Sequence, residues 1–148
     1  MTIPKNKEAE PIDILLVEDN PADIRLTQEA FKETKVRSTL HVVRDGAEAL
    51  DFLKRNGRYL TVPRPHMILL DLNLPKKDGR QVLTEIKTSP DFKSIPTVIL
   101  TTSSAKEDIH HTYYHHANCY ITKPADLDQF MNIIKQIEQF WLNIVQLP

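Results

Sequence analysis

Acidic side chains follow two apolar runs of this sequence directly. Glu18 and Asp19 come after Ile12–Val17, and Asp71 comes after Met67–Leu70. Carboxylate oxygens are the ligands that Mg²⁺ prefers, and bound Mg²⁺ usually keeps several waters. We expect Asp19 and Asp71 to bind such a cation directly, with Glu18 nearer the outer shell and a backbone carbonyl just after Asp71 completing the set. The pattern predicts Mg²⁺ as the cofactor, with Mn²⁺ as a substitute.

Asp71 also suits a second role. A carboxylate beside Mg²⁺ can act as a nucleophile toward a phosphoryl group, because the metal neutralises the phosphoryl oxygens and holds them in line. Thr101 and Lys123 each stand at the end of a further apolar run. The Thr101 hydroxyl can donate a hydrogen bond to a phosphoryl oxygen, and Lys123 can supply a positive charge. A cis peptide bond at Pro124 would aim this lysine inward.

The elements that must position these residues alternate between strand and helix. Short apolar or β-branched runs predict five strands, at Ile12–Val17, Thr39–Val43, Met67–Leu70, Pro96–Leu100 and Cys119–Thr122. A helical pattern follows each strand, after Asn20, at Ala47–Leu53, around Val82 and Ile86, at Ala105–His116 and after Asp126. Strands that are apolar on both faces indicate a parallel sheet covered by helices on both sides. With right-handed crossovers, the predicted fold is a doubly wound α/β fold, (βα)5, with a five-stranded parallel sheet.

In a sheet of this kind, ligands bind outside the carboxyl ends of the strands. The carboxylates, Thr101 and Lys123 all stand at such ends, although more than a hundred residues separate the first from the last. We therefore expect them to converge on one edge of the sheet.

Composition limits the class of protein. The chain has 148 residues, of which 41% are hydrophobic, and its formal net charge is -1. These values are typical of one globular domain and give no basic footprint for nucleic acid. No apolar run approaches the roughly 20 residues that a membrane span needs. The single cysteine, Cys119, is interpreted as a small buried hydrophobic residue in a reducing compartment, which favours the cytoplasm. We expect a flexible leader at residues 1–11 and one domain at residues 12–148.

Four motifs in this order resemble the receiver domain of two-component response regulators. They are Leu-Leu-Val-Glu-Asp-Asn, Leu-Leu-Asp-Leu-Asn-Leu-Pro-Lys-Lys-Asp-Gly, Val-Ile-Leu-Thr-Thr-Ser and Tyr-Ile-Thr-Lys-Pro. Each lies at a predicted strand end, and the resemblance covers about residues 12–142, nearly the whole chain. It implies the flavodoxin-like receiver fold and a switch protein rather than an enzyme, with only Mg²⁺-dependent self-phosphorylation and self-dephosphorylation.

The resemblance also implies a role for each matching residue. Asp71 would receive a phosphoryl group from the phosphohistidine of a sensor histidine kinase. Asn73 would lend its backbone carbonyl to the metal that Glu18 and Asp19 bind. Thr101 and Lys123 would bind the phosphoryl group, and Tyr120 would swing inward when Thr101 moves. An unidentified downstream protein would then recognise the changed face.

The chain looks most similar to stand-alone response regulators that are paired with phytochrome-type kinases. The loop Asn56–Pro65, the run that ends in Asp78-Gly79-Arg80 and the long C-terminal helix without an output domain carry this narrower resemblance. A receiver serving another kinase is the alternative.

The last predicted helix has more apolar residues than one core face needs. One stripe contains Leu127, Met131, Ile134, Trp141 and Val145, and a second contains Ile133, Ile137, Phe140, Ile144 and Leu147. Large exposed apolar patches are uncommon on monomers. We hypothesise that the second stripe, and Ile133, Ile137, Phe140 and Ile144 in particular, packs against a second copy of the chain.

The segment His110–His116 contains four histidines. His111 and His115 have the spacing of metal ligands on one helical face, but no Glu stands between them as in zinc proteases. We interpret the segment as a polar, partly exposed helix face. A signalling surface tuned by histidine protonation is a further reading.

The sequence argues against three other functions. A phosphatase of the haloacid-dehalogenase type needs a second acid two residues after its nucleophile, where this chain has Asn73, and its nucleophile follows the first strand. An interaction module that has lost phosphorylation would lack residues that are all present here. A flavin-binding domain would need a phosphate-cradling loop rich in Gly or Ser after the first strand.

Overall fold

The computed structural model describes residues 11–33, 37–102, 119–123 and 126–139. Its centre is a five-stranded parallel sheet with the order β2-β1-β3-β4-β5. The strands are β1 (Ile12–Val17), β2 (Ser38–Val43), β3 (Met67–Leu70), β4 (Thr97–Thr101) and β5 (Cys119–Thr122). The predicted fold class is confirmed, and the predicted bounds of β1, β3 and β5 agree with the structure residue for residue.

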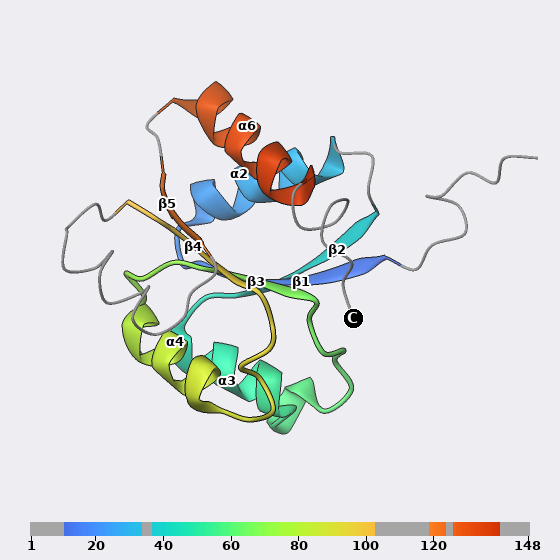
Figure 1. The fold of residues 1–148 in the computed structure, drawn as a ribbon, viewed down its shortest axis with the longest axis vertical. Helices are drawn as coiled ribbons and strands as arrows, with labels where there is room; N and C mark the ends of the chain where they lie inside the picture. The colour runs from blue at the N-terminus through green and yellow to red at the C-terminus, as the bar shows by residue number, and fades with distance from the viewer. Residues whose placement is uncertain (1–10, 34–36, 103–118, 124–125, 140–148) are drawn as a thin grey trace, which may run out of the picture.

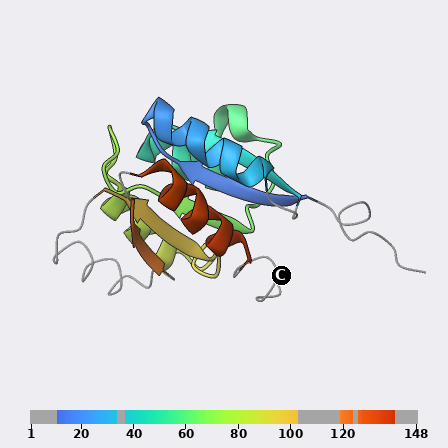
Figure 2. The ribbon, with the colours of Figure 1, turned by 90° about the horizontal axis from the view of Figure 1, so that it is seen from above.

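Helices cover both faces of this sheet (Figures 1 and 2). In the described ranges they are α2 (Pro21–Lys32), α3 (Gly46–Lys54), α4 (Gly79–Thr88) and α6 (Leu127–Glu138), with a short 3₁₀ helix η1 (Gly57–Tyr59). Helices α2 and α6 contact each other on one face, and α3 and α4 contact each other on the other. The predicted helix at Ala105–His116 lies outside the described residues, as do the histidines of that segment.

Polar caps set where the helices begin. Asn20, Asp45, Asp78 and Asp126 are the N-caps of α2, α3, α4 and α6, and each side chain accepts a hydrogen bond from a backbone N–H of the first turn. These bonds satisfy donors that a helix start leaves without a partner. The helices predicted to follow Asn20 and Asp126 therefore begin where the sequence pattern placed them.

Alternating residues of the central strands form two separate cores. Leu15 and Ile68 belong to the core under α3 and α4, whereas Ile14 and Met67 belong to the core under α2 and α6. All four are fully buried, and each such side chain stabilises the fold by roughly 1.5–3 kcal/mol. Strands that are buried on both faces hold the carboxyl edge of the sheet in place.

Strand β2 begins one residue before its predicted bounds, Thr39–Val43, and β4 is shifted by one residue from its predicted bounds, Pro96–Leu100. Two further details differ from the sequence-based expectations. The segment Asn56–Pro65 is not entirely loop, because it contains η1. In α6, Ile137 is only 5% exposed and packs in the chain's own core with Phe130 and Ile134. Ile137 was hypothesised to pack against a second copy, but here it faces the sheet, because Phe130, Ile134 and Ile137 recur at the 3.6-residue period of one helix face. Ile133 packs partly against the same core, and Phe140 and Ile144 lie outside the described residues.

Candidate functional site

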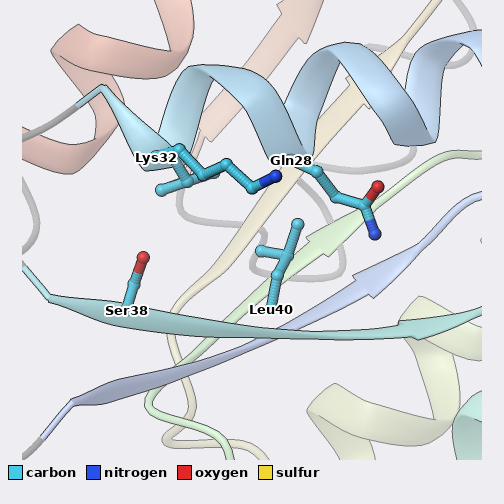
Figure 3. Close-up of a pocket in the computed structure, with 5 residues that line it drawn as sticks. Gln28, Lys32, Ser38 and Leu40 are labelled. Carbon is cyan, nitrogen blue, oxygen red and sulfur yellow. The ribbon is translucent and has the colours of Figure 1, made fainter.

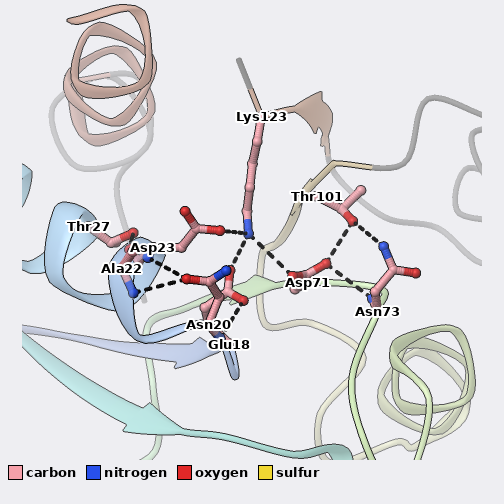
Figure 4. A network of polar contacts seen from close by, with 9 residues as sticks. All are labelled: Glu18, Asn20, Ala22, Asp23, Thr27, Asp71, Asn73, Thr101 and Lys123. Atoms are coloured by element: carbon pink, nitrogen blue, oxygen red, sulfur yellow. Dashed lines mark hydrogen bonds and ion pairs between the residues drawn. The ribbon is translucent and has the colours of Figure 1, made fainter. Parts of the chain in front are cut away.

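The polar residues at the carboxyl ends of β1, β3, β4 and β5 form one connected network (Figure 4). The hydrogen-bonding pattern of the sheet continues into it. The backbone N–H of Glu18 donates to Val43 O at 3.0 Å, that of Asp71 to Val17 O at 3.1 Å, and that of Lys123 to Thr101 O at 2.7 Å. The backbone of each of these residues is therefore held by a neighbouring strand of the sheet.

Asp71 lies at the centre of the network and is 8% exposed. Its Oδ1 accepts a hydrogen bond from the Thr101 hydroxyl at 2.7 Å and from the Asn73 backbone N–H at 3.1 Å. Its Oδ2 faces Lys123 Nζ at 3.2 Å. The Asn73 side chain also reaches Thr101, with 3.5 Å between Nδ2 and Oγ1. Hydrogen-bond donors and a positive charge thus surround both carboxylate oxygens.

Lys123 enters from the end of β5, and its side chain is only 4% exposed. Besides Asp71, its ammonium group binds Glu18 Oε1 and lies 2.8 Å from Asp23 Oδ2. Asp23 belongs to the first turn of α2, where its backbone N–H donates to the capping side chain of Asn20 at 3.1 Å. Asp23 was not predicted from the sequence as a site residue.

Glu18 and Asp19 differ in exposure, although they are adjacent in the chain. Glu18 is 3% exposed, and its second carboxylate oxygen accepts the Asn20 backbone N–H at 3.2 Å, whereas Asp19 is exposed. One carboxylate oxygen each from Glu18, Asp19 and Asp71 lie within 4.8 Å of one another. Such a set of oxygen ligands fits a hard divalent cation, whose charge would offset the repulsion among three carboxylates.

Burial and charge shift the pKa values of this network in different directions. Burial raises the pKa of Glu18 to about 7, with a further contribution from the charge of Asp71 and against the contacts with Lys123. Burial acts in the same sense on Asp71, but the Thr101 hydroxyl, the charge of Lys123 and the Asn73 N–H outweigh it and hold the pKa of Asp71 below its usual range. Burial alone would lower the pKa of Lys123, but hydrogen bonds and charges from the three carboxylates raise it. The donors around Asp71 thus favour its ionised form, whereas burial disfavours the ionised form of Glu18.

Most residues predicted from the sequence converge at this site. Asp71, Glu18, Asp19, Asn73, Thr101 and Lys123 all belong to the edge described above. Tyr120 pairs with Ile99 in the β4–β5 register and packs, partly buried, against the core under α3 and α4. Pro124 lies outside the described residues, so its peptide bond stays a prediction.

Cys119 packs against the core under α2 and α6 without being fully buried, and burial raises the pKa of its thiol. This places it among the core-facing residues, as predicted, and gives no sign of a reactive thiolate.

Two surface pockets lie away from this network. One of about 310 Å³ is lined by Gln28, Phe31, Lys32, Ser38 and Leu40, between α2 and the edge strand β2 (Figure 3). The other, of about 480 Å³, lies beside the C-terminal end of α3 and the segment after α4. Neither of these two pockets is lined by a residue of the polar network.

No helix in the described part of the chain is long and apolar enough to cross a membrane.

Comparison with known proteins agrees with this geometry. Residues 14–135 match the model of the response regulator receiver domain. The response regulator Rcp1 of Synechocystis sp. is 52% identical over 135 residues, which are 91% of this chain and 92% of Rcp1. The probable methanogenesis regulatory protein FilR2 of Methanothrix harundinacea is 42% identical, over 91% of this chain and 87% of FilR2.

Solved structures of similar proteins have the same fold as this chain. The crystal structure of the phosphorylated cyanobacterial phytochrome response regulator RcpA matches with a TM-score of 0.91 and 54% identity, over 94% of this chain and 99% of RcpA. The Mn²⁺-bound form of Rcp1 matches with a TM-score of 0.90 and 51% identity, over 93% of this chain and 99% of that one. The chain belongs to the response regulator receiver family of two-component signalling proteins.

Proposed function

We propose that Asp71 is the phosphoryl acceptor of a two-component signalling pathway. The observation that carries this proposal is the arrangement of donors around its carboxylate. Thr101 and the Asn73 N–H face Oδ1, and Lys123 faces Oδ2. These groups match the charge and the three acceptor oxygens that a phosphoryl group brings. Because the pKa of Asp71 lies below its usual range, its carboxylate is ionised near neutral pH, which is the form that attacks a phosphoryl group.

Mg²⁺ is the proposed cofactor, and Mn²⁺ the proposed substitute. Glu18, Asp19 and Asp71 would hold the cation, and the close approach of their oxygens supports this ligand set. The backbone carbonyl of Asn73 is a further proposed ligand. When bound, the cation would neutralise negative charge on the incoming phosphoryl group. The Mn²⁺-bound form of Rcp1 is an observation on a relative that supports the same assignment.

Thr101 and Tyr120 are the proposed switch. A phosphoryl oxygen on Asp71 offers the Thr101 hydroxyl a new acceptor, in place of the carboxylate oxygen that it binds at 2.7 Å. Movement of Thr101 would leave space that Tyr120 could fill from the neighbouring strand. The changed packing at β4 and β5 would then be read by an unidentified downstream protein.

The phosphoryl donor is proposed to be a sensor histidine kinase of the phytochrome type. The high identity to Rcp1 and to the phytochrome response regulator RcpA supports this choice. The proposal includes slow Mg²⁺-dependent self-phosphorylation and self-dephosphorylation. It also includes a stand-alone receiver domain over residues 12–148 that acts in the cytoplasm.

A homodimer stays a prediction. Of its four proposed contact residues, Ile137 belongs to the core and Ile133 packs partly against it, while Phe140 and Ile144 lie outside the described residues. The mass of the protein in solution, with and without phosphorylation, would test it.

The acceptor is tested by Asp71→Asn, with Asp45→Asn as a matched control. Asp45 is also a buried aspartate, at 7% exposure, but it caps α3, a role that Asn fills as well. The full-length protein is incubated with a phytochrome-type histidine kinase, ATP and Mg²⁺, and the phosphorylated site is mapped by mass spectrometry. We expect wild type and Asp45→Asn to be labelled and Asp71→Asn to lose labelling while it keeps its fold. Labelling that survives in Asp71→Asn would refute the assignment.

A further inference from the structure

Lys123 contacts three carboxylates, and one of them has no part in the candidate metal site. Its Nζ binds Glu18 Oε1, lies 2.8 Å from Asp23 Oδ2 and lies 3.2 Å from Asp71 Oδ2. Glu18 and Asp71 are also members of the group whose oxygens could hold a cation, whereas Asp23 is not. In Figure 4, Asp23 approaches the lysine from α2, on the side away from Thr101.

These three contacts match the hydrogen-bonding capacity of the lysine. An ammonium group has three N–H donors and no acceptor. Because the Lys123 side chain is only 4% exposed, water cannot easily replace a partner that is lost. A buried cation without enough partners is strongly disfavoured. The position of Lys123 therefore depends on which carboxylates remain available to it.

A divalent cation would change that availability. Glu18 and Asp71 would have to direct oxygens to the cation, which carries twice the charge of the lysine and competes with it for the same groups. The Asp23 carboxylate, outside this group, would keep its contact with Nζ. Asp23 would then be the one carboxylate that contacts Lys123 without also binding the cation.

The local structure holds Asp23 in a position from which it can contact Lys123. It is the third residue of α2, in the turn that follows the Asn20 cap, and its backbone N–H donates a hydrogen bond to the Asn20 side chain. A negative charge is favourable at that end of a helix. Asp23 thus approaches from a rigid element, with 24% of its side chain exposed, compared with 3% for Glu18.

We propose that Asp23 is a positioning residue that anchors Lys123 when Glu18 and Asp71 bind a divalent cation, and so keeps the lysine aimed at the phosphoryl group on Asp71. The contact between Asp23 and Lys123 is present in the structure. The role of this contact in phosphoryl transfer rests on the function proposed above. In that transfer, the P–N bond of the donor phosphohistidine breaks and a P–O bond to Asp71 forms. The electron pair of the broken bond leaves with the imidazole. Lys123 contacts the transferred oxygens and neither gains nor loses a proton.

The anchor is tested by Asp23→Asn, which removes the charge with little change of shape, and by Asp23→Glu, which restores the charge. The control is Asp128→Asn, because Asp128 is an exposed aspartate in the first turn of α6 and has no role in the proposed site. The ¹H–¹⁵N signal of the Lys123 ammonium group, assigned by its loss in Lys123→Met, is recorded in EDTA and in Mg²⁺. The rate of Asp71 labelling by acetyl phosphate is measured on the same proteins.

In EDTA we expect the ammonium signal in every protein that retains Lys123, because Glu18 and Asp71 still hold the lysine. In Mg²⁺ we expect it to persist in wild type and Asp128→Asn, to vanish in Asp23→Asn and to return in Asp23→Glu. The labelling rate of Asp23→Asn should fall about tenfold, since a misplaced charge no longer orients the phosphoryl group. A persistent signal in Asp23→Asn with Mg²⁺, or its loss from wild type, would overturn the anchor.

The two proposals fail in different ways. If Asp71 is never labelled but the ammonium signal depends on Asp23 as described, the anchor stands and the function proposed for Asp71 is wrong. If Asp71 is labelled at equal rates in wild type and Asp23→Asn, the acceptor stands and the positioning role of Asp23 is wrong.

Discussion

Glu18 and Asp71 are two carboxylates of one crevice whose environments separate their protonation states. Glu18 is 3% exposed, and burial raises its pKa to about 7. Asp71 is buried to a similar degree, but Thr101, Lys123 and the Asn73 N–H compensate its charge and lower its pKa. Asp71, the proposed acceptor, is thus the carboxylate whose donors outweigh its burial. Burial and the nearby charge of Asp71 therefore destabilise the ionised form of Glu18.

This separation predicts a pH dependence of stability without metal. The folded state binds a proton at Glu18 more tightly than the unfolded chain does, so its contribution to stability is complete below pH 4.5 and lost as the pH rises to about 7. In EDTA, the free energy of unfolding of wild type should therefore fall relative to Glu18→Gln across this window. The relative loss should reach up to about 3 kcal/mol, at about 1.4 kcal/mol per pKa unit. Urea unfolding at a series of pH values measures it.

Two controls accompany this measurement. Glu29→Gln removes an exposed glutamate of α2 and should keep a constant difference from wild type over the same pH range. Saturating Mg²⁺ should flatten the wild-type curve, because a bound cation favours ionised Glu18. Curves of wild type and Glu18→Gln that run parallel in EDTA from pH 4.5 to 7 would contradict the raised pKa.

Asp71, Thr101 and Lys123 were predictable from the sequence as site residues, whereas Asp23 was not, and the difference has a physical reason. Asp71, Thr101 and Lys123 each follow a strand, so the geometry of a parallel sheet brings them together without further information. Asp23 follows the cap of α2, where an acidic residue is common for reasons of helix stability alone. Its contact with Lys123 joins residues 100 positions apart and depends on how α2 lies over the sheet. Nothing in the local pattern around Asp23 specifies that placement.

The turn between β3 and α4 connects the proposed acceptor to a tightly packed glycine. The Gly79 N–H donates to Leu72 O at 3.0 Å, which closes the loop after Asp71. A methyl group at Gly79 would lie 2.2 Å from the Asp71 carbonyl oxygen and 2.6 Å from Leu72 Cα. Both are backbone atoms, so the loop could not yield by a rotamer change.

We therefore expect Gly79→Ala to displace the loop that carries Asn73. It should destabilise the fold by about 1–3 kcal/mol, as overpacking does elsewhere, and weaken Mg²⁺ binding severalfold. Calorimetric titration with Mg²⁺ and thermal unfolding measure the two effects. The matched control is Gly57→Ala, because Gly57 has a positive φ of 57° but no atom within 4 Å of an added methyl group. It should lose about 1 kcal/mol through backbone strain and bind Mg²⁺ as wild type does.

Element bounds were predictable where a sharp chemical change marks them. Met67–Leu70 and Cys119–Thr122 are apolar runs that end at polar residues, and both were predicted correctly. The 3₁₀ helix at Gly57–Tyr59 was missed because its sequence is turn-like, and its supporting contacts lie outside the loop itself. The Tyr59 ring packs at a tilt against Phe52, with 5.4 Å between ring centroids, and its hydroxyl donates a hydrogen bond to Glu48 at 3.0 Å. These contacts come from α3, and the pattern of the loop does not contain them.

At the scale of the whole molecule, α6 completes the core that lies on the α2 face of the sheet. Phe130, Ile134 and Ile137 are all at most 5% exposed there. The sequence pattern predicted two stripes on this helix, one with Ile134 and the other with Ile133 and Ile137, and neither contained Phe130. The core face takes Ile134 from the first stripe and Ile137 from the second, because α6 packs beside α2.

This packing predicts how α6 variants unfold. Ile137→Ala should lower the free energy of unfolding by about 2–5 kcal/mol, the usual cost of such a cavity, and by the same amount at low and high protein concentration. Ile133→Ala, at a partly buried position of the same helix, should cost clearly less. Urea unfolding at two protein concentrations measures both. A loss in Ile137→Ala that depends on concentration would mean that Ile137 packs against a second chain, because only an interface couples stability to the amount of protein.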